Sequence, residues 1–169
     1  MQGSPVRMLV LTALLAALVF VVTALVRLPV PASAGGGYLN IGDSIISAGA
    51  LLLGPLPATF AAACGSGIAD VASGAALYVV PTVVIKGLMG LIIGLFAHPR
   101  RFLLYTSGVA LAEILMVLGY GLFDWFAIAP ATAWTLLPFN AAQAVVNFVL
   151  ALLIYKPVLA LSGVIGGGE

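Results

Sequence analysis

Long uncharged apolar runs, separated by short polar or proline-containing breaks, make up most of this chain. No charged residue lies between Arg7 and Arg27, and none lies between Asp43 and Asp70. The second run is too long for a single crossing, because a bilayer core of about 30 Å takes about 20 helical residues, and the sequence Gly54–Pro57 divides it. The pattern predicts six membrane-spanning helices, at about 8–28, 41–54, 56–75, 80–97, 102–122 and 137–156.

The segments between these runs are predicted to be loops. Prolines and a run of glycines predict a non-helical loop over 28–40, and an aromatic, proline-containing loop is expected over 123–136. The first run resembles the apolar part of a signal peptide, but the candidate cleavage sequence at 32–34 is weak. We therefore interpret the first run as a membrane span.

Composition supports a membrane protein and excludes several other classes. Hydrophobic residues make up 63% of the 169 residues, and the chain has six basic and five acidic residues. A soluble domain carries about 25% charged residues, so a soluble globular enzyme is excluded, and the high hydrophobicity excludes disorder. The sequence predicts an all-α membrane protein that forms a single integral membrane domain over 1–169. The net charge of +1 gives no support for binding to nucleic acid.

The distribution of basic residues predicts an orientation. With six spans, Arg7, Arg100, Arg101 and Lys156 fall on the same side as both termini, whereas the opposite side has Arg27. Lysine and arginine are enriched in cytoplasmic loops, so both termini are predicted to be cytoplasmic. The outward loops then contain four aromatic residues that are typical of an interfacial belt: Tyr38, Tyr78, Trp125 and Trp134.

Four ionisable side chains fall inside predicted spans, where charge is costly and often functional. Asp43 is expected at the outer end of the second span, Asp70 and Lys86 about one turn deeper in their own spans, and Glu113 near mid-depth. Lys86 needs a counter-charge, which Asp70, Glu113 or a ligand anion would supply. A structural Lys86–Asp70 ion pair is the simplest of these alternatives.

The sixth span carries three amides on one helix face, because Asn140, Gln143 and Asn147 are spaced three and four residues apart. Such a face is suited to neutral hydrogen bonds with a small polar heterocycle. Hydrogen bonds between helices would explain it equally well. Together with the ionisable side chains, these amides predict a polar cup open to the outside above an apolar floor.

Small residues recur at helical spacing, as is common where membrane helices pack closely. They occur at Ala13 and Ala17, at Ala61, Gly65, Ala69 and Ser73, and at Gly90 and Gly94. Each stripe is explained by packing inside the bundle, and one of them is free to receive a partner's helix. No catalytic or metal-binding motif and no phosphate-binding loop is present, so we expect no enzyme activity and no cofactor.

The stretch from Tyr38 to Gly94 carries the most specific motifs. It reads Tyr-Leu-Asn-Ile-Gly-Asp over 38–43, Gly-Ser-Gly-Ile-Ala-Asp over 65–70 and Ile-Lys-Gly-Leu-Met-Gly over 85–90. This stretch resembles the substrate-binding S-components of energy-coupling factor (ECF) vitamin transporters. The resemblance implies a six-helix bundle in the plasma membrane of a prokaryote that binds one vitamin near the outer face. It also implies a transmembrane coupling subunit and two cytoplasmic ATPases as partners.

The same resemblance implies roles for particular residues. Ala13 and Ala17 look like the family's docking motif for the coupling subunit, and Asp43 and Asp70 fall in the scaffold motifs as an ion pair or as part of the pocket. Positions that match the family's pocket are Tyr38, Asn40, Lys86, Glu113, Trp125, Trp134, Asn140, Gln143 and Asn147.

The motifs favour vitamin B6 or a hydroxymethylpyrimidine-type thiamine precursor as the ligand, followed by riboflavin. Two other functions stay open. One is an autonomous ion-coupled secondary transporter or channel, in which Asp70, Lys86 and Glu113 form a proton relay. The other is a membrane scaffold without a ligand.

Overall fold

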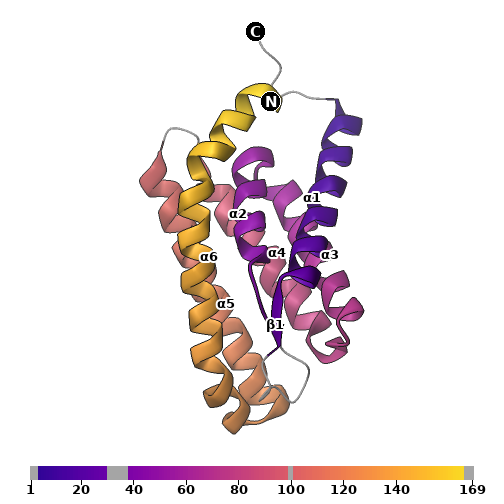
Figure 1. The fold of residues 1–169 in the computed structure, drawn as a ribbon, viewed down its shortest axis with the longest axis vertical. Coiled ribbons are helices and arrows are strands. Elements are labelled where there is room, and N and C mark those ends of the chain that lie inside the picture. The colour runs from indigo at the N-terminus through magenta and orange to yellow at the C-terminus, as the bar shows by residue number, and fades with distance from the viewer. Residues whose placement is uncertain (1–3, 30–37, 99–100, 166–169) are drawn as a thin grey trace.

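The structure is a computed structural model that describes residues 4–29, 38–98 and 101–165. Helices dominate these residues, as the sequence predicts, and two short strands accompany them (Figure 1). The elements are α1 (Pro5–Leu25), β1 (Arg27–Pro29), β2 (Tyr38–Asn40), α2 (Gly42–Leu53), α3 (Pro55–Ala72), η1 (Ala76–Tyr78), α4 (Val79–Phe96), α5 (Phe102–Phe123), η2 (Asp124–Ile128) and α6 (Pro130–Ile165). Of the two short turns, η1 is a 3₁₀-helix and η2 a π-helix.

The helices run along the long axis of the bundle, and α2 lies in its interior. α1 begins and α6 ends at the same end, which we call the terminal end (Figure 1). α3 packs between α1 and α4, and α5 packs between α4 and α6. α2 contacts α1, α3, α4 and α6, so any polar group on α2 lies at the centre of the bundle.

Four of the described helical segments are long and apolar enough to cross a membrane: Pro5–Leu25, Ala76–Phe96, Phe102–Ile128 and Pro130–Leu161. α2 has only 12 residues, which at 1.5 Å per residue rise about 18 Å and fall short of a bilayer core of about 30 Å. α3 has 18 residues but is interrupted by small and polar ones, which its position between α1 and α4 explains. The helix lengths and their apolar composition thus indicate a multi-pass membrane protein, and six full crossings stay a prediction.

A β-hairpin precedes the short helix α2 and extends the length that this part of the chain covers along the bundle. β1 pairs antiparallel with β2, with Arg27 opposite Asn40 and Pro29 opposite Tyr38. At about 3.3 Å per residue, the strand β2 adds about 10 Å, so that β2 and α2 together come close to the bilayer thickness. The prediction that residues 26–28 are helical is wrong, because α1 ends at Leu25. Leu28 directly precedes Pro29, and a residue before a proline is disfavoured in the helical region. Residues 30–37 lie outside the described residues.

The predicted loop over 123–136 is also wrong, because this segment is largely helical. η2 continues α5, and α6 begins at Pro130, about two turns before the predicted start. Proline is favoured in the first turn of a helix, where its missing N–H costs nothing. Pro138, which falls in the first turn of the predicted sixth span, lies inside α6, as does Pro157.

Two of the three small-residue stripes are used for packing within the bundle. A Cβ added at Gly65 would lie 2.5 Å from the backbone oxygen of Ala16, and one added at Gly90 would lie 2.6 Å from that of Ala58. Side chains are absent there because the helix backbones approach so closely. Ala13 and Ala17, by contrast, are exposed on the outer face of α1.

Candidate functional site

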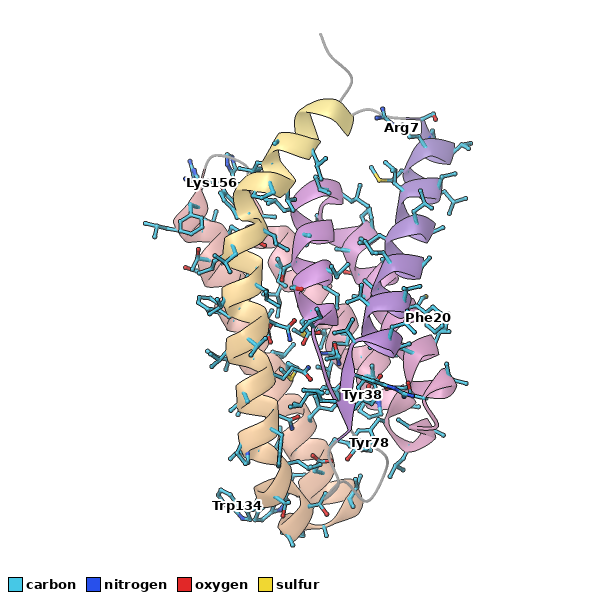
Figure 2. All side chains as sticks on the ribbon, viewed as in Figure 1. Arg7, Phe20, Tyr38, Tyr78, Trp134 and Lys156 are labelled. Atoms are coloured by element: carbon cyan, nitrogen blue, oxygen red, sulfur yellow. The ribbon has the colours of Figure 1, made fainter. Side chains whose placement is uncertain are left out.

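A partly open pocket lies near the end of the bundle opposite the terminal end, and we call this end the pocket end. The labelled side chains Tyr38 and Tyr78, which line the pocket, lie toward this end (Figure 2). The empty volume is about 600 Å³, including the space at the mouth. The lining residues are Thr23, Tyr38, Leu39, Asn40, Ser66, Asp70, Ala75, Tyr78, Thr82, Lys86, Tyr120, Asp124, Leu136, Phe139, Asn140 and Gln143.

Two amides of α6 fix the junction between β2 and α2 beside this pocket. The Gln143 side chain accepts a hydrogen bond from the Asn40 backbone N–H (3.0 Å). The Asn147 side chain accepts from the Ser44 backbone N–H (3.0 Å) and donates to the Asn40 carbonyl (2.9 Å). The first turn of a helix has backbone N–H groups without partners inside the helix, and no side chain of α2's own N-cap residue satisfies them. Asn147 therefore caps, from another helix, a helix that begins inside the bundle.

Lys86 forms a buried ion pair with Asp43. The Lys86 ammonium lies 2.6 Å from one Asp43 oxygen, and the two side chains are 3% and 1% exposed. The Gln143 amide donates to the other Asp43 oxygen at 3.0 Å. The hypothesis of a Lys86–Asp70 pair is therefore wrong. Asp43 is also deeper than expected, because α2 begins within the bundle and not at its surface (Figure 1).

The pocket lining also carries two tyrosine–aspartate pairs. The Tyr38 hydroxyl donates to Asp70 (2.6 Å), and the Tyr78 hydroxyl donates to Asp124 (2.8 Å). The second carboxylate oxygen of each aspartate is buried and has no hydrogen-bond partner in the described part of the chain.

Aromatic rings form a third part of the lining. The Tyr78 and Tyr120 rings lie 6.3 Å apart, and the Lys86 ammonium lies 5.6 Å from the centre of the Tyr120 ring. The hydroxyls of Tyr120 and Thr82 are 2.8 Å apart and share a hydrogen bond. With Phe139 and Leu136, these rings give the pocket apolar walls beside its polar groups, as is usual for pockets that bind small organic molecules.

The structure brings together six of the residues that the sequence singled out. Tyr38, Asn40, Asp70, Lys86, Asn140 and Gln143 all line the pocket. Asn140 makes no hydrogen bond to another described residue and is half-buried, so its amide is available to a ligand. Asn147 stands behind the lining and holds Asn40 in place.

Three predicted pocket residues lie elsewhere. Glu113 is buried in α5, interacts electrostatically with Asp43 and Lys86, and does not line the pocket. Trp125 and Trp134 are 41% and 66% exposed, and their rings contact each other edge to face at 6.2 Å. Figure 2 places Trp134 on the outside of the bundle at the pocket end. An interfacial position explains both tryptophans better than ligand stacking does.

Sequence reasoning missed several lining residues, among them Tyr78, Tyr120, Asp124 and Phe139. Tyr78 had been assigned to the interfacial belt and Asp124 to a loop. A signal was present, because Tyr120 and Asp124 are four residues apart and share a helix face when the helix continues through η2. The assumption of a loop after Leu122 concealed this face.

The two ends of the bundle differ in basic charge. Arg7 and Lys156 lie at the terminal end (Figure 2), and Arg101 directly precedes α5, which begins at the same end. Arg100 lies outside the described residues. At the pocket end, Arg27 is exposed and stands over the Tyr38 ring at 5.8 Å. This asymmetry is the one on which the predicted orientation rests.

Comparison with known proteins places the chain in a family. Residues 4–160 match the family described as "ECF-type riboflavin transporter, S component". A protein of Pyrococcus woesei, described as "Uncharacterized protein in gap 3'region", is 47% identical over 106 residues, which cover 60% of this chain and 68% of that protein. The family match covers nearly the whole chain, and it confirms the resemblance found in the sequence motifs. This chain is therefore a multi-pass membrane protein that belongs to the S-component family of ECF transporters, the substrate-binding components of those transporters.

Proposed function

We propose that this S-component binds a B vitamin in the pocket and delivers it to an ECF module in the plasma membrane of a prokaryote. The observation that carries the proposal is the position of the pocket. Its polar and aromatic lining converges at one end of a bundle whose outer surface is apolar, and that end lies opposite the basic terminal end. The basic residues favour a cytoplasmic terminal end, so the pocket would face the outside, from which substrate arrives.

The ligand is proposed to be a vitamin with a flat aromatic ring. Riboflavin is the leading candidate, because the family description names it. The pyridine and pyrimidine compounds favoured by the sequence motifs are the next candidates. The walls of Tyr78, Tyr120 and Phe139 are suited to any of these rings, since aromatic pairs are favoured by about 0.5–1.5 kcal/mol beyond the area they bury.

The partners are proposed to be a transmembrane coupling subunit, docked on α1, and two cytoplasmic ATPases. Only 11% of the α1 span is buried within the bundle, against 44% of the span that contains α4. The stripe of Ala13 and Ala17 lies on this open face, whereas the stripes that contain Gly65 and Gly90 are covered by neighbouring helices. A close helix–helix contact in a membrane needs such small residues, so α1 is the best-suited docking face.

Calorimetry tests this proposal, with the purified protein titrated in turn with riboflavin, pyridoxine and hydroxymethylpyrimidine. We expect one of them to bind at micromolar concentration or tighter, and Asn140→Ala to weaken its Kd roughly fivefold, the effect of one lost hydrogen bond of about 1 kcal/mol. Thr135→Ala is the matched control on α6, since the Thr135 hydroxyl is exposed and bonded within its own helix. Absence of binding by all three compounds to correctly folded protein would contradict the proposal.

A further inference from the structure

The charges that line the pocket do not balance. Lys86 is the one cation among the lining residues, and Asp43 already neutralises it at 2.6 Å. Asp70 and Asp124 also line the pocket, and neither is paired with a basic side chain among the described residues. Arg27 stands over the Tyr38 ring and is not part of the lining. The lining therefore carries an excess of negative charge.

The two aspartates are held in the same way. Each accepts a hydrogen bond from a tyrosine through one oxygen, and each keeps a second oxygen without a partner. Asp70 is 4% exposed and Asp124 is 1% exposed. A buried carboxylate oxygen without a donor costs free energy until a donor reaches it. Each tyrosine–aspartate pair thus keeps one buried carboxylate oxygen without a hydrogen-bond donor in the described part of the chain, on an aspartate that lines the pocket.

We propose that the Tyr38–Asp70 and Tyr78–Asp124 pairs form a two-point acceptor site that selects the charge of the ligand. The site takes a neutral or cationic compound that brings hydrogen-bond donors to two separate positions, such as hydroxyl, amino or ring N–H groups. It excludes the phosphate ester of the same compound, because the phosphate brings negative charge toward carboxylates in a medium of low dielectric constant. This inference rests on the proposed function, since it assigns the ligand class of the same pocket.

Matched pairs of a vitamin and its own phosphate ester test the site: riboflavin with flavin mononucleotide, and pyridoxine with pyridoxine 5′-phosphate. For the vitamin that binds, we expect the phosphate to bind about 100-fold more weakly, because placing like charges together costs several kcal/mol. Asp70→Asn and Asp124→Asn keep the shape and an acceptor oxygen but remove the charge. Each variant is expected to reduce the ratio of the Kd of the phosphate to the Kd of the vitamin at least tenfold, because one of the repelling charges is gone.

Three further variants keep the test decisive. Glu113→Gln is the control, because it replaces a buried carboxyl group on α5 that does not line the pocket, and the ratio of the Kd of the phosphate to that of the vitamin should stay within about twofold of the parent's. Tyr38→Phe and Tyr78→Phe keep both aspartates, so the phosphate should still bind more weakly than the vitamin. These variants provide a test that does not depend on the folding of the asparagine variants. Thermal unfolding in detergent checks the folding of each variant.

The outcomes separate this inference from the proposed function. If neither the vitamins nor their phosphates bind the folded protein, the proposed function fails. If a vitamin binds and its phosphate binds as tightly or more tightly, the function stands and the acceptor site is wrong. If Glu113→Gln reduces the ratio of the two Kd values as much as the two asparagine variants do, the selection is not made by the tyrosine–aspartate pairs, and the inference is again overturned.

Discussion

Replacing Lys86 by methionine is expected to destabilise the protein by about 3–5 kcal/mol, the cost of leaving one member of a buried ion pair without its partner. The Asp43 carboxylate would then lie at the centre of the bundle with the Gln143 amide as its remaining donor. In thermal unfolding in detergent, a loss of this size would lower Tm by roughly 10 °C for a chain of this length. Asp43→Asn is expected to have a similar effect, because it removes the carboxylate that lies 2.6 Å from the Lys86 ammonium.

The double variant Lys86→Met, Asp43→Asn shows whether the loss of stability in the single variants comes from breaking the ion pair. It removes both charges, and the asparagine can still accept from Gln143, so its Tm should be higher than that of either single variant. Lys156→Met is the matched control, because Lys156 is exposed at the terminal end, and it should change stability by less than about 0.5 kcal/mol. Single variants as stable as the parent, or effects that simply add in the double variant, would contradict a structural ion pair.

Placing tryptophan at Ala13 or Ala17 is expected to abolish vitamin uptake and to leave vitamin binding unchanged. Both alanines are exposed on α1 and neither lines the pocket, so a larger side chain is expected to disturb neither the core nor the ligand. It would, however, hold a partner's helix away from the α1 backbone, and close approach is what stabilises helix contacts in membranes. Uptake of labelled vitamin by cells and Kd of the purified variants are the two measurements.

The matched control for the docking face is Ala142→Trp on α6. Ala142 is also a small exposed residue, but it lies on a different helix from the proposed docking stripe. This variant should retain both binding and uptake. If Ala142→Trp abolished uptake as completely as Ala13→Trp does, or if the α1 variants lost binding together with uptake, docking and binding would not be separate surfaces.

The sequence predicted the helices well because apolar runs in a membrane protein are long and their breaks are sharp. The boundary between α2 and α3 is an example. Gly54 adopts φ = 83°, a value that other residues avoid, and Pro55 begins the next helix directly after it. Such local chemistry is visible in one sequence without any knowledge of tertiary contacts.

Depth inside the bundle could not be predicted in the same way. The sequence placed Asp43 at the outer end of the second span, whereas a strand leads into α2 at mid-bundle. The partner of Lys86 follows from that placement, because Asp43 is then level with it. A strand of three residues has no periodic signal strong enough to be recognised before the fold is known.

The amides of α6 illustrate how one pattern supports two roles. Their shared face was predicted correctly from spacing, and the sequence left open whether they bind a ligand or another helix. Gln143 and Asn147 bond to the β2–α2 junction, which takes up most of their hydrogen-bonding groups. Asn140 lines the same pocket and keeps its amide unbonded within the described residues. The division depends on where Asn40 and Ser44 lie, which only the tertiary structure determines.

Native mass spectrometry of the protein, purified from cells supplied with B vitamins, tests the central claim most directly. We expect one vitamin per chain in the parent and in Ala142→Trp, and none in Asn140→Trp, because a tryptophan at this lining position fills the pocket. The two variants place the same bulky residue two positions apart on α6, one in the pocket and one on the outer face. A folded parent protein without a bound vitamin, or an Asn140→Trp variant that retains one, would contradict the claim that this pocket is the substrate site.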